Sequence, residues 1–350
     1  MSLTDLGASV IKLLPPEAAH TATIRLLKKG LGVPLRTPEP DIALSVTLPK
    51  SGLKLHSPVG LAAGFDKNCD VPDAMAKYGF GFIECGTVTP KPQPGNPKPR
   101  LFRLTEDRAV INRMGFNNHG LDYFVRRLKK YRGTVPIGAN VGANKDSTDR
   151  VADYVMGVEA VAPYAHYVTI NISSPNTPGL RGLQDKASLE ALLTACGKAE
   201  RAGKPVFLKL APDLDEKAIE DIIGVVRTEG EWLSGLIISN TTLARPDSLK
   251  SEHKGEAGGL SGAPLLHPST EVLRVFAQEL SGEFDLIGAG GISCGADAYA
   301  KIRAGAQAVQ FYSAMVFEGP GLAAHINEEL THLMHADGLG YISDVVGSAL

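Results

Sequence analysis

The sequence has little that would support a metal centre, a disulfide framework or a membrane span. Its four cysteines, Cys69, Cys85, Cys196 and Cys294, form no CxxC pair, and no HxH or HExxH motif accompanies them. This argues against a zinc site and against a secreted disulfide-rich domain. No apolar run approaches the roughly 20 residues that cross a bilayer. The N-terminus also lacks the apolar stretch and cleavage site of a signal peptide.

Further absences exclude other classes of protein. Lys and Arg number 36 against 38 Asp and Glu, so the net charge of -2 provides no basic field for general nucleic-acid binding. No GxGxxG motif follows an expected strand, so a nicotinamide cofactor in a Rossmann fold is not indicated. What remains is an ordinary globular composition, with 43% hydrophobic and 21% charged residues. We therefore expect no nucleic acid as partner and no bound metal.

Short apolar segments alternate with helix-like segments from about residue 59 onward. The apolar segments are continuous, which is typical of parallel strands covered on both faces. There are eight of them, and this pattern predicts an α/β fold of the (β/α)8 type, the TIM barrel. The expected strands cover residues 59–63, 82–86, 137–141, 167–172, 206–210, 236–239, 286–290 and 308–311. The clearest expected helices cover 151–162, 189–202, 216–228 and 296–304, with Gly203 and Gly305 as terminators.

Residues 1–40 differ from the rest and predict a separate element in front of the barrel domain, residues 41–350. Apolar residues recur with helical spacing on both sides of Pro15-Pro16, which predicts a helical hairpin. Residues 1–32 carry four basic and two acidic side chains, so this hairpin could lie in a membrane interface. A helix pair packed on the barrel is the alternative.

Two connections are too long for ordinary loops between a strand and a helix. They span residues 87–119 and 242–267, and both are rich in polar residues. Long loops at the carboxyl end of a barrel usually cover or complete a site. We therefore expect these two connections to form a lid.

Polar residues end nearly every expected strand, where the active sites of barrels collect. Asn140, Asn171, Asn176 and Asn240 each donate and accept hydrogen bonds, which suits a flat heterocycle with carbonyl and N–H groups. Lys209 stands in an apolar strand, where a buried ammonium is costly, so a negative or electron-rich ligand is expected beside it. Taken singly, each asparagine also fits a turn or a cap, and the lysine also fits a structural ion pair.

A glycine-rich turn, 288–291, and Tyr312-Ser313 follow the last two strands, where many barrels bind phosphate through backbone N–H groups. A tight turn would also explain the glycines. Amides, a buried-looking lysine, a phosphate turn and no metal motif together suit flavin mononucleotide (FMN), which would carry the redox chemistry while the protein orients it.

Several long motifs in this chain resemble those of one family. They are AAGFDKN at 62–68, GTVTP at 86–90, PGNP at 94–97, INRMGFNN at 111–118, NISSPNTPGLR at 171–181 and LIGAGGI at 286–292. Together they closely resemble dihydroorotate dehydrogenases of the quinone-dependent, membrane-associated class (class 2), over nearly the whole chain. The resemblance implies oxidation of (S)-dihydroorotate to orotate in pyrimidine (UMP) biosynthesis. FMN would accept the hydride, and a membrane quinone, ubiquinone or menaquinone, would be the final electron acceptor.

The same resemblance implies roles for the matching residues. Cofactor contacts are expected at Ala62, Ala63, Gly64, Lys67, Thr87, Asn140, Asn171, Lys209, Ser239, Gly262, Gly290, Gly291, Tyr312 and Ser313. Substrate contacts are expected at Lys67, Asn112, Arg113, Met114, Gly115, Phe116, Asn171, Asn176, Asn240 and Thr241. A quinone site is expected at His20, Arg103 and Tyr312. Within the substrate set, Lys67 and Arg113 would meet the carboxylate.

Ser174 matches the general base of the family, which removes a proton from C5 while hydride leaves C6. A serine hydroxyl is a weak base and needs help from a neighbouring group or a water chain. The soluble class carries a cysteine at this position, and no cysteine lies near it here, so Ser174 favours the membrane-associated class. Lys209 would stabilise negative charge on the reduced flavin.

The resemblance also bears on location and on rival functions. Relatives of this class use an N-terminal extension as a quinone entrance, which favours an interface role for residues 1–40. No organellar presequence or transmembrane anchor is visible, so we expect a bacterial enzyme attached peripherally to the cytoplasmic side of the inner membrane. A processed organellar enzyme is the alternative. The rival functions are a soluble flavin barrel using fumarate or nicotinamide, a barrel lyase or isomerase for a sugar phosphate, and a membrane-peripheral module that only holds FMN.

Overall fold

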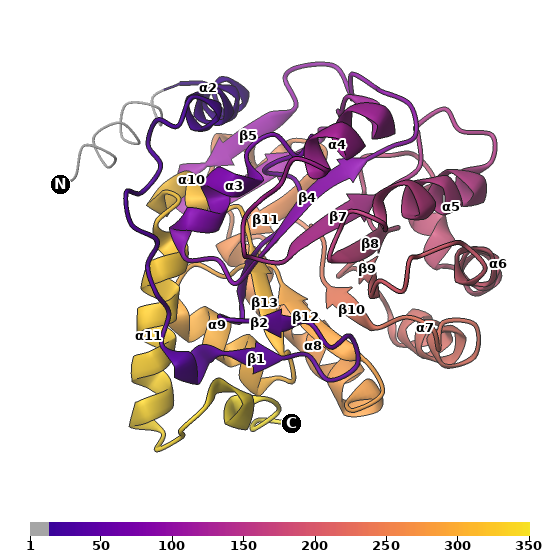
Figure 1. Ribbon diagram of the computed structural model, residues 1–350. Coiled ribbons are helices and arrows are strands. Elements are labelled where there is room, and N and C mark those ends of the chain that lie inside the picture. Colours follow the sequence, from indigo (N-terminus) through magenta and orange to yellow (C-terminus); the bar gives the residue numbers. More distant parts are fainter. Residues whose placement is uncertain (1–13) are drawn as a thin grey trace.

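A computed structural model describes residues 14–350, and it confirms the predicted TIM barrel. Eight parallel strands follow one another around a closed barrel, and the last pairs with the first (Figure 1). They are β3 (Val59–Leu61), β4 (Phe82–Val88), β7 (Ile137–Val141), β8 (Tyr167–Asn171), β9 (Val206–Leu210), β10 (Gly235–Ile238), β12 (Asp285–Ala289) and β13 (Ala308–Phe311). Each expected strand is present within a few residues of its predicted ends.

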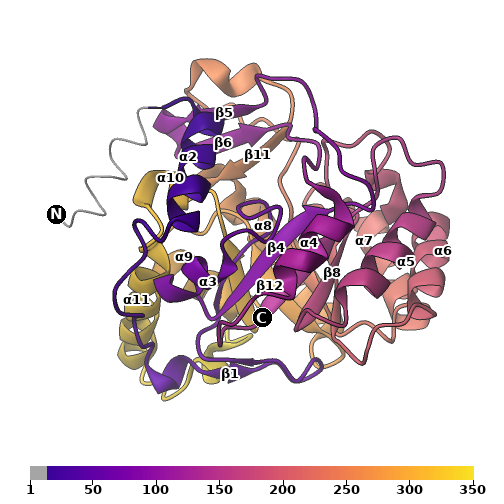
Figure 2. The same ribbon diagram turned by 45° about the horizontal axis from the view of Figure 1, so that its top comes forward.

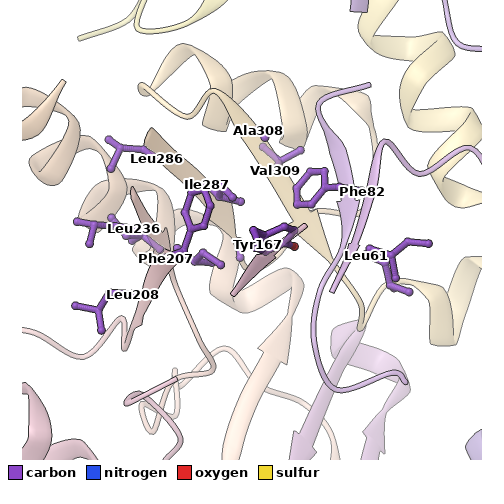
Figure 3. Close-up of a cluster of buried hydrophobic side chains, with 14 of the residues drawn as sticks. Leu61, Phe82, Tyr167, Phe207, Leu208, Leu236, Leu286, Ile287, Ala308 and Val309 are labelled. Carbon is purple, nitrogen blue, oxygen red and sulfur yellow. The ribbon is translucent and has the colours of Figure 1, made fainter. Parts of the chain in front are cut away.

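Large rings fill the interior of the barrel. Phe82, Tyr167 and Phe207 come from β4, β8 and β9, and Figure 3 shows their side chains close together. The ring of Tyr167 lies edge-on to both others, at centroid distances of 6.3 Å and 5.5 Å. Glycines on neighbouring strands leave the space, since an ideal Cβ on Gly60 or Gly138 would come within 2.3 Å of Phe82 or 2.1 Å of Tyr167. This packed layer closes the interior and leaves the carboxyl end for a site.

The longer helices surround the barrel, and α5, α6 and α7 lie side by side on one flank (Figures 1 and 2). They are α4 (Gly120–Leu128), α5 (Arg150–Val161), α6 (Lys186–Gly197), α7 (Glu216–Thr228), α8 (Leu266–Leu280), α9 (Gly295–Arg303) and α11 (Leu322–Ala336). The prediction that Gly203 ends α6 is wrong: the helix ends at Gly197, and Gly203, with φ of +67°, lies in the turn before β9. Gly305 follows the end of α9 as predicted, with φ of +106°.

The two long connections are not merely loops. Each contributes strands to an antiparallel sheet of β11 (Gly259–Gly262), β6 (Ala109–Asn112) and β5 (Leu101–Leu104), in that order. Burial alternates along β5, where Phe102 and Leu104 face a small separate core that includes Leu249 and Leu260. Apolar residues at every second position are a strand signal, and the prediction of polar loops overlooked it.

The N-terminal segment reaches the same end of the barrel as this small sheet. Helix α2 (Pro16–Lys28) lies beside β5 and close to the short helix α10 (Met315–Glu318) (Figures 1 and 2). Pro16 is its first residue, as the Pro15-Pro16 break predicts. The first half of the expected hairpin lies outside the described residues.

Three shorter elements complete the fold. They are α3 (Pro72–Met75) and the hairpin of β1 (Val46–Thr47) and β2 (Lys54–Leu55). The buried carboxylate of Asp285 accepts hydrogen bonds from the backbone N–H groups of Lys50 and Ser51 at 2.9 Å and 2.8 Å, which fixes the β1–β2 turn to the barrel. Among the helices in residues 14–350, none is both long and apolar enough to cross a membrane.

Candidate active site

A cavity of about 900 Å³ opens at the carboxyl ends of the barrel strands and extends to α2. Its volume is within the range of about 300–1,000 Å³ that small-molecule sites occupy. It brings together most of the residues that the sequence predicts for the site: His20, Ala63, Gly64, Lys67, Thr87, Arg103, Asn112, Met114, Gly115, Phe116, Asn171, Ser174, Asn176, Lys209, Asn240, Thr241, Tyr312 and Ser313. Seven others, Ala62, Asn140, Ser239, Gly262, Gly290, Gly291 and Arg113, do not line it.

The predicted asparagines form one hydrogen-bonded network across neighbouring strand ends. Asn171 donates from Nδ2 to Thr87 Oγ1 at 2.9 Å and to Asn140 Oδ1 at 3.2 Å, and Thr87 donates to the same Asn140 oxygen at 2.6 Å. Asn240 donates to Ser173 Oγ at 2.9 Å and to Asn171 Oδ1 at 3.3 Å. Asn140 thus lies behind the wall and orients the side chains that do face the cavity.

Glu84 lies beneath this network and was not predicted. Its carboxylate is fully buried on β4 and accepts hydrogen bonds from Asn140 at 2.8 Å, Thr169 at 2.9 Å, Gln310 at 3.1 Å and Tyr167 at 3.2 Å. Four donors satisfy a charge that would otherwise be too costly to bury. The only signal in the sequence is a single acidic residue inside an apolar strand.

Lys209 presents a buried ammonium to the cavity from β9. Only 6% of the residue is exposed. Burial lowers the pKa of Lys209 because it disfavours the charged form, and the carboxylate of Glu84 opposes this shift. Glu84 is not within ion-pairing distance, so the lysine remains available to a ligand. Among the described residues Lys209 lines the cavity and forms no ion pair, so its role toward a ligand stays a prediction.

Ser174 and its neighbours line the side of the cavity that follows β8. Ser174 is 6% exposed, and its Oγ accepts a hydrogen bond from the backbone N–H of Asn176 at 3.3 Å. Asn176 Nδ2 donates to Asn112 Oδ1 at 3.2 Å, which joins this loop to β6. Asn96, which was not predicted as a site residue, donates from Nδ2 to the backbone oxygens of Arg113 and Asn176 at 3.0 Å and 3.1 Å. These contacts give the Ser174 loop a defined place against the small sheet.

Arg181 is a second positioning residue that the sequence reasoning did not single out. Its guanidinium donates to the backbone oxygens of Ser173 at 3.0 Å and Thr241 at 2.7 Å, and it pairs with Asp213 at 2.7 Å. One side chain therefore joins the loops that follow β8, β9 and β10. A planar group with five donors suits such a junction.

Arg113 does not reach the cavity. Its guanidinium pairs with Glu256 at 2.7 Å, donates to the Ala257 oxygen at 3.0 Å, and lies 4.5 Å from the centroid of the Phe102 ring. The structure therefore does not bring Arg113 to the cavity where a substrate carboxylate is expected, because Glu256 and the Phe102 ring hold its side chain away from it. Only the neighbouring residues 112 and 114–116 line the cavity.

Lys67 stands where the polar part of the cavity meets α2. Its Nζ donates to the Gly64 oxygen at 2.7 Å. Burial lowers the pKa of Lys67 to about 8, with a further lowering from Arg100, while Glu17 and Asp66 oppose the shift. The ammonium is therefore the main form at neutral pH, and it is poised to lose its proton in mildly alkaline solution.

His20 connects α2 to the barrel. Its Nε2 lies 2.7 Å from the Phe65 oxygen, so this nitrogen donates to the carbonyl. Burial lowers the pKa of His20 to about 4, and Lys67 adds to the effect. Phe65 lies edge-on between the rings of His20 and Tyr312, at 5.6 Å and 5.7 Å. Beyond these rings the wall becomes apolar, with Ala19, Leu26, Leu27 and Leu31.

The predicted phosphate turn has the backbone that close approach requires. Gly290 and Gly291 have φ of +104° and +83°, a region that other residues rarely adopt. An ideal Cβ on Gly291 would lie 2.3 Å from the backbone nitrogen of Leu266. Both glycines lie behind the wall, while Ser313 lines it and shares a hydrogen bond of 2.6 Å with Ser261.

Together the fold and the site define a (β/α)8-barrel protein with a small-molecule site of cationic, amide and hydroxyl groups at its carboxyl end. The family model described as dihydroorotate dehydrogenase matches residues 44–334. The chain is 52% identical to dihydroorotate dehydrogenase (quinone) of Novosphingobium aromaticivorans, over 99% of this chain and 100% of the relative. It is 50% identical to the protein of the same name from Parvibaculum lavamentivorans, over 99% of both chains.

Solved structures give the same result. The ligand-free dihydroorotate dehydrogenase of Eimeria tenella has a TM-score of 0.90 and 42% identity, covering 95% of this chain and 99% of the other. The complex of the Eimeria enzyme with ferulenol has a TM-score of 0.89 and 41% identity, covering 95% of both chains. The chain belongs to the dihydroorotate dehydrogenase family, and the prediction of the quinone-dependent class is confirmed by its relatives.

Proposed function

We propose that this protein oxidises (S)-dihydroorotate to orotate in pyrimidine biosynthesis, with FMN as its bound cofactor and a membrane quinone as the final electron acceptor. The observation that carries the proposal is one continuous cavity of about 900 Å³, which is polar around Ser174 and Lys209 and apolar along α2. A polar heterocycle and an apolar quinone can each use one end of it. Membership of the family supports the same assignment.

The residues present fit FMN. Lys209, Asn171 and Ser313 line the cavity, and their ammonium, amide and hydroxyl groups would suit the ring and the phosphate of a flavin. The Gly290–Gly291 turn lies behind that wall and has the backbone conformation that we propose for the phosphate turn. When bound, FMN supplies the hydride acceptor that no side chain can provide. Glu84 and Asn140 stay behind the wall and hold the amide network in one orientation. This network would require little rearrangement when the cofactor binds.

For the substrate, we propose that Lys67 binds the carboxylate and that Asn112, Asn176 and Asn240 satisfy the carbonyl and N–H groups of the ring. Ser174 Oγ accepts the C5 proton as the hydride leaves C6. A hydroxyl that accepts a proton must pass its own proton on, so the base acts with a neighbouring acceptor or water. The backbone N–H of Asn176, 3.3 Å from Ser174 Oγ, orients that oxygen.

For the quinone, we propose that the headgroup enters beside α2 and approaches His20, Arg103 and Tyr312. These residues line the same cavity as the substrate residues. Leu26 and Leu31 are 37% and 54% exposed near its mouth, which suits contact with a membrane surface. Residues 1–40 would thus be the access element and residues 41–350 the catalytic barrel, held peripherally on the cytoplasmic side of a bacterial inner membrane.

The first test is the visible absorbance of the purified protein without oxygen, before and after dihydroorotate is added. We expect a flavin spectrum that bleaches with dihydroorotate and recovers when a soluble quinone is added. A flavin that stays oxidised would reject the substrate, and a bleached flavin that no quinone reoxidises would reject the acceptor. A protein that cannot be loaded with FMN would favour a lyase or isomerase.

The second test concerns the base. Ser174→Ala should retain flavin but slow its reduction by dihydroorotate by about 10² to 10⁴-fold, the usual contribution of a general base. Ser174→Cys is the matched control, because it restores a group that can accept the proton and should recover part of the rate. Stopped-flow reduction at a near-normal rate in the alanine variant would remove Ser174 from this role.

A further inference from the structure

Lys301 is a buried lysine that the proposed reaction does not use. It lies on α9 and is 0% exposed. Its ammonium donates to Ser269 Oγ at 2.7 Å and to Thr270 Oγ1 at 3.0 Å. Both acceptors are neutral hydroxyls, and no carboxylate in residues 14–350 forms an ion pair with it. Burial lowers the pKa of Lys301 to about 7, as expected for a charge without a close partner.

The surroundings of Lys301 provide little negative potential to offset its charge. Its nearest acidic influence is Asp297, one turn earlier on α9. That carboxylate already accepts hydrogen bonds from the backbone N–H and the hydroxyl of Ser293, both at 2.8 Å. The acceptors Ser269 and Thr270 are the fourth and fifth residues of α8, where free backbone N–H groups make a cation unfavourable. A buried ammonium in this place needs an anion nearby.

The neighbouring feature that could hold an anion is the glycine turn after β12. Ser269 Oγ, which accepts from Lys301, contacts the Gly290 oxygen at 3.2 Å. The stem of Lys301 passes behind the same strand, since an ideal Cβ on Gly288 would lie 3.2 Å from Lys301 Cδ. Gly291 packs directly on Leu266, the first residue of α8. The lysine and the turn are therefore joined through the start of α8.

We propose that Lys301 is the buried counter-charge for the phosphate of the bound flavin, and that it makes the glycine turn prefer FMN to riboflavin. The inference rests on the proposed function, because it assumes a flavin in the barrel. Lys301 acts through Ser269 and Gly290, so it is a positioning and electrostatic residue rather than a ligand contact. A charge acts over such a distance because the protein interior screens it weakly.

This role has a signature that a purely structural role lacks. FMN and riboflavin share the isoalloxazine ring, and only FMN carries the phosphate charge. Loss of the Lys301 charge must therefore weaken FMN binding and leave riboflavin binding unchanged. Damage to the fold of the turn or of α8 would instead disturb the barrel mouth and weaken both ligands.

The experiment compares the two dissociation constants in Lys301→Met, which keeps an unbranched side chain one atom shorter and removes its charge. Protein stripped of flavin at high salt is titrated with FMN and with riboflavin, and flavin fluorescence reports binding. We expect FMN to bind at least tenfold more weakly and riboflavin to bind within twofold of the unaltered protein. Arg303→Met is the matched control: it removes one positive charge from the exposed face of the same helix and should leave the FMN to riboflavin ratio unchanged.

Equal weakening of FMN and riboflavin in Lys301→Met, or no weakening of FMN, would overturn the proposal. If this variant does not fold, Ser269→Ala tests the same path with the lysine retained. Ser269→Ala should raise the dissociation constant of FMN about threefold and leave that of riboflavin unchanged. An unchanged ratio of the two dissociation constants would count against the proposal. Unaltered protein that binds neither flavin would refute the proposed function itself, whereas a preference for FMN that survives in Lys301→Met refutes only the role of Lys301.

Discussion

The lowered pKa of Lys67 predicts that the protein loses its affinity for orotate in mildly alkaline solution. A lysine whose pKa lies near 8 carries its charge below that pH and loses it as the pH rises through that value. We propose that the charge binds the carboxylate of the ligand, so the free protein must take up a proton to bind orotate above pH 8. The dissociation constant of orotate should then be constant below about pH 7, rise as the pH passes through 8, and level off once Lys67 has lost its charge.

Replacement of Lys67 with methionine measures how much the lysine charge contributes to orotate binding. A hydrogen bond to a charged group contributes about 1.5–3 kcal/mol, which corresponds to roughly ten- to a hundredfold in a dissociation constant. Lys67→Met should therefore bind orotate that much more weakly at pH 7 while it retains flavin. Its affinity should no longer depend on pH between 6.5 and 9.0, because the group that titrates has been removed.

Orotate binding to the oxidised holoprotein can be followed as a change in the flavin absorbance at pH 6.5 to 9.0. Two groups near Lys67 do not confuse the result, because Glu17 has a lowered pKa and His20, with a pKa of about 4, is neutral throughout. The buried carboxyl of Asp66 has a raised pKa, but it would also titrate in Lys67→Met. A wild-type affinity that is flat up to pH 9.0, or a variant with the same pH dependence as wild type, would refute the reasoning.

Three further outcomes are expected. Phe207→Ala should lower the free energy of unfolding, measured with urea, by about 3–5 kcal/mol, since it empties part of the packed barrel interior; a loss below about 1 kcal/mol would mean that the interior collapses into the space. Gly291→Ala should release flavin on dialysis, because its Cβ would collide with the backbone of Leu266. Glu17→Gln removes the ion pair of α2 with Arg100 at 2.8 Å and should raise the KM for quinone about fivefold, as for a loss of about 1 kcal/mol, without slowing anaerobic flavin reduction. Equal effects on both half-reactions would contradict that assignment.

The barrel could be predicted because its strands are buried on both faces and its site residues stand at strand ends. Residues such as Asn171 and Lys209 interrupt an apolar pattern at positions where all strands point the same way, so their convergence follows from the topology. Glu84 also interrupts such a pattern, but it lies one layer deeper. Its role depends on four donors from three other strands, Asn140, Tyr167, Thr169 and Gln310, and no local pattern carries that information.

Arg113 shows a different limit. It stands between Asn112 and Met114, which line the cavity, and its charge makes it a natural partner for a carboxylate. The direction of its side chain is decided by Glu256, more than 140 residues later in the chain, and by the ring of Phe102. Phe102 belongs to the small sheet, and Glu256 lies just before its strand β11, in the two connections that were expected to be loops. Because the sequence did not predict this sheet, it could not predict the direction of the Arg113 side chain.

The amphipathic pattern of α2 fits two arrangements, a helix packed on the barrel and a helix that lies in a membrane interface. The structure shows that these two arrangements do not exclude each other. A helical stripe of apolar residues indicates that one face is covered, but it does not identify the cover. In α2, Ala19 and Leu27 are buried against the barrel end, while Leu26 and the following Leu31 remain partly exposed at the mouth of the cavity. One helix can thus pack on the barrel and still present an apolar edge. That edge is continuous with the cavity wall that includes His20, and this continuity is the physical basis on which we propose the α2 end for the quinone.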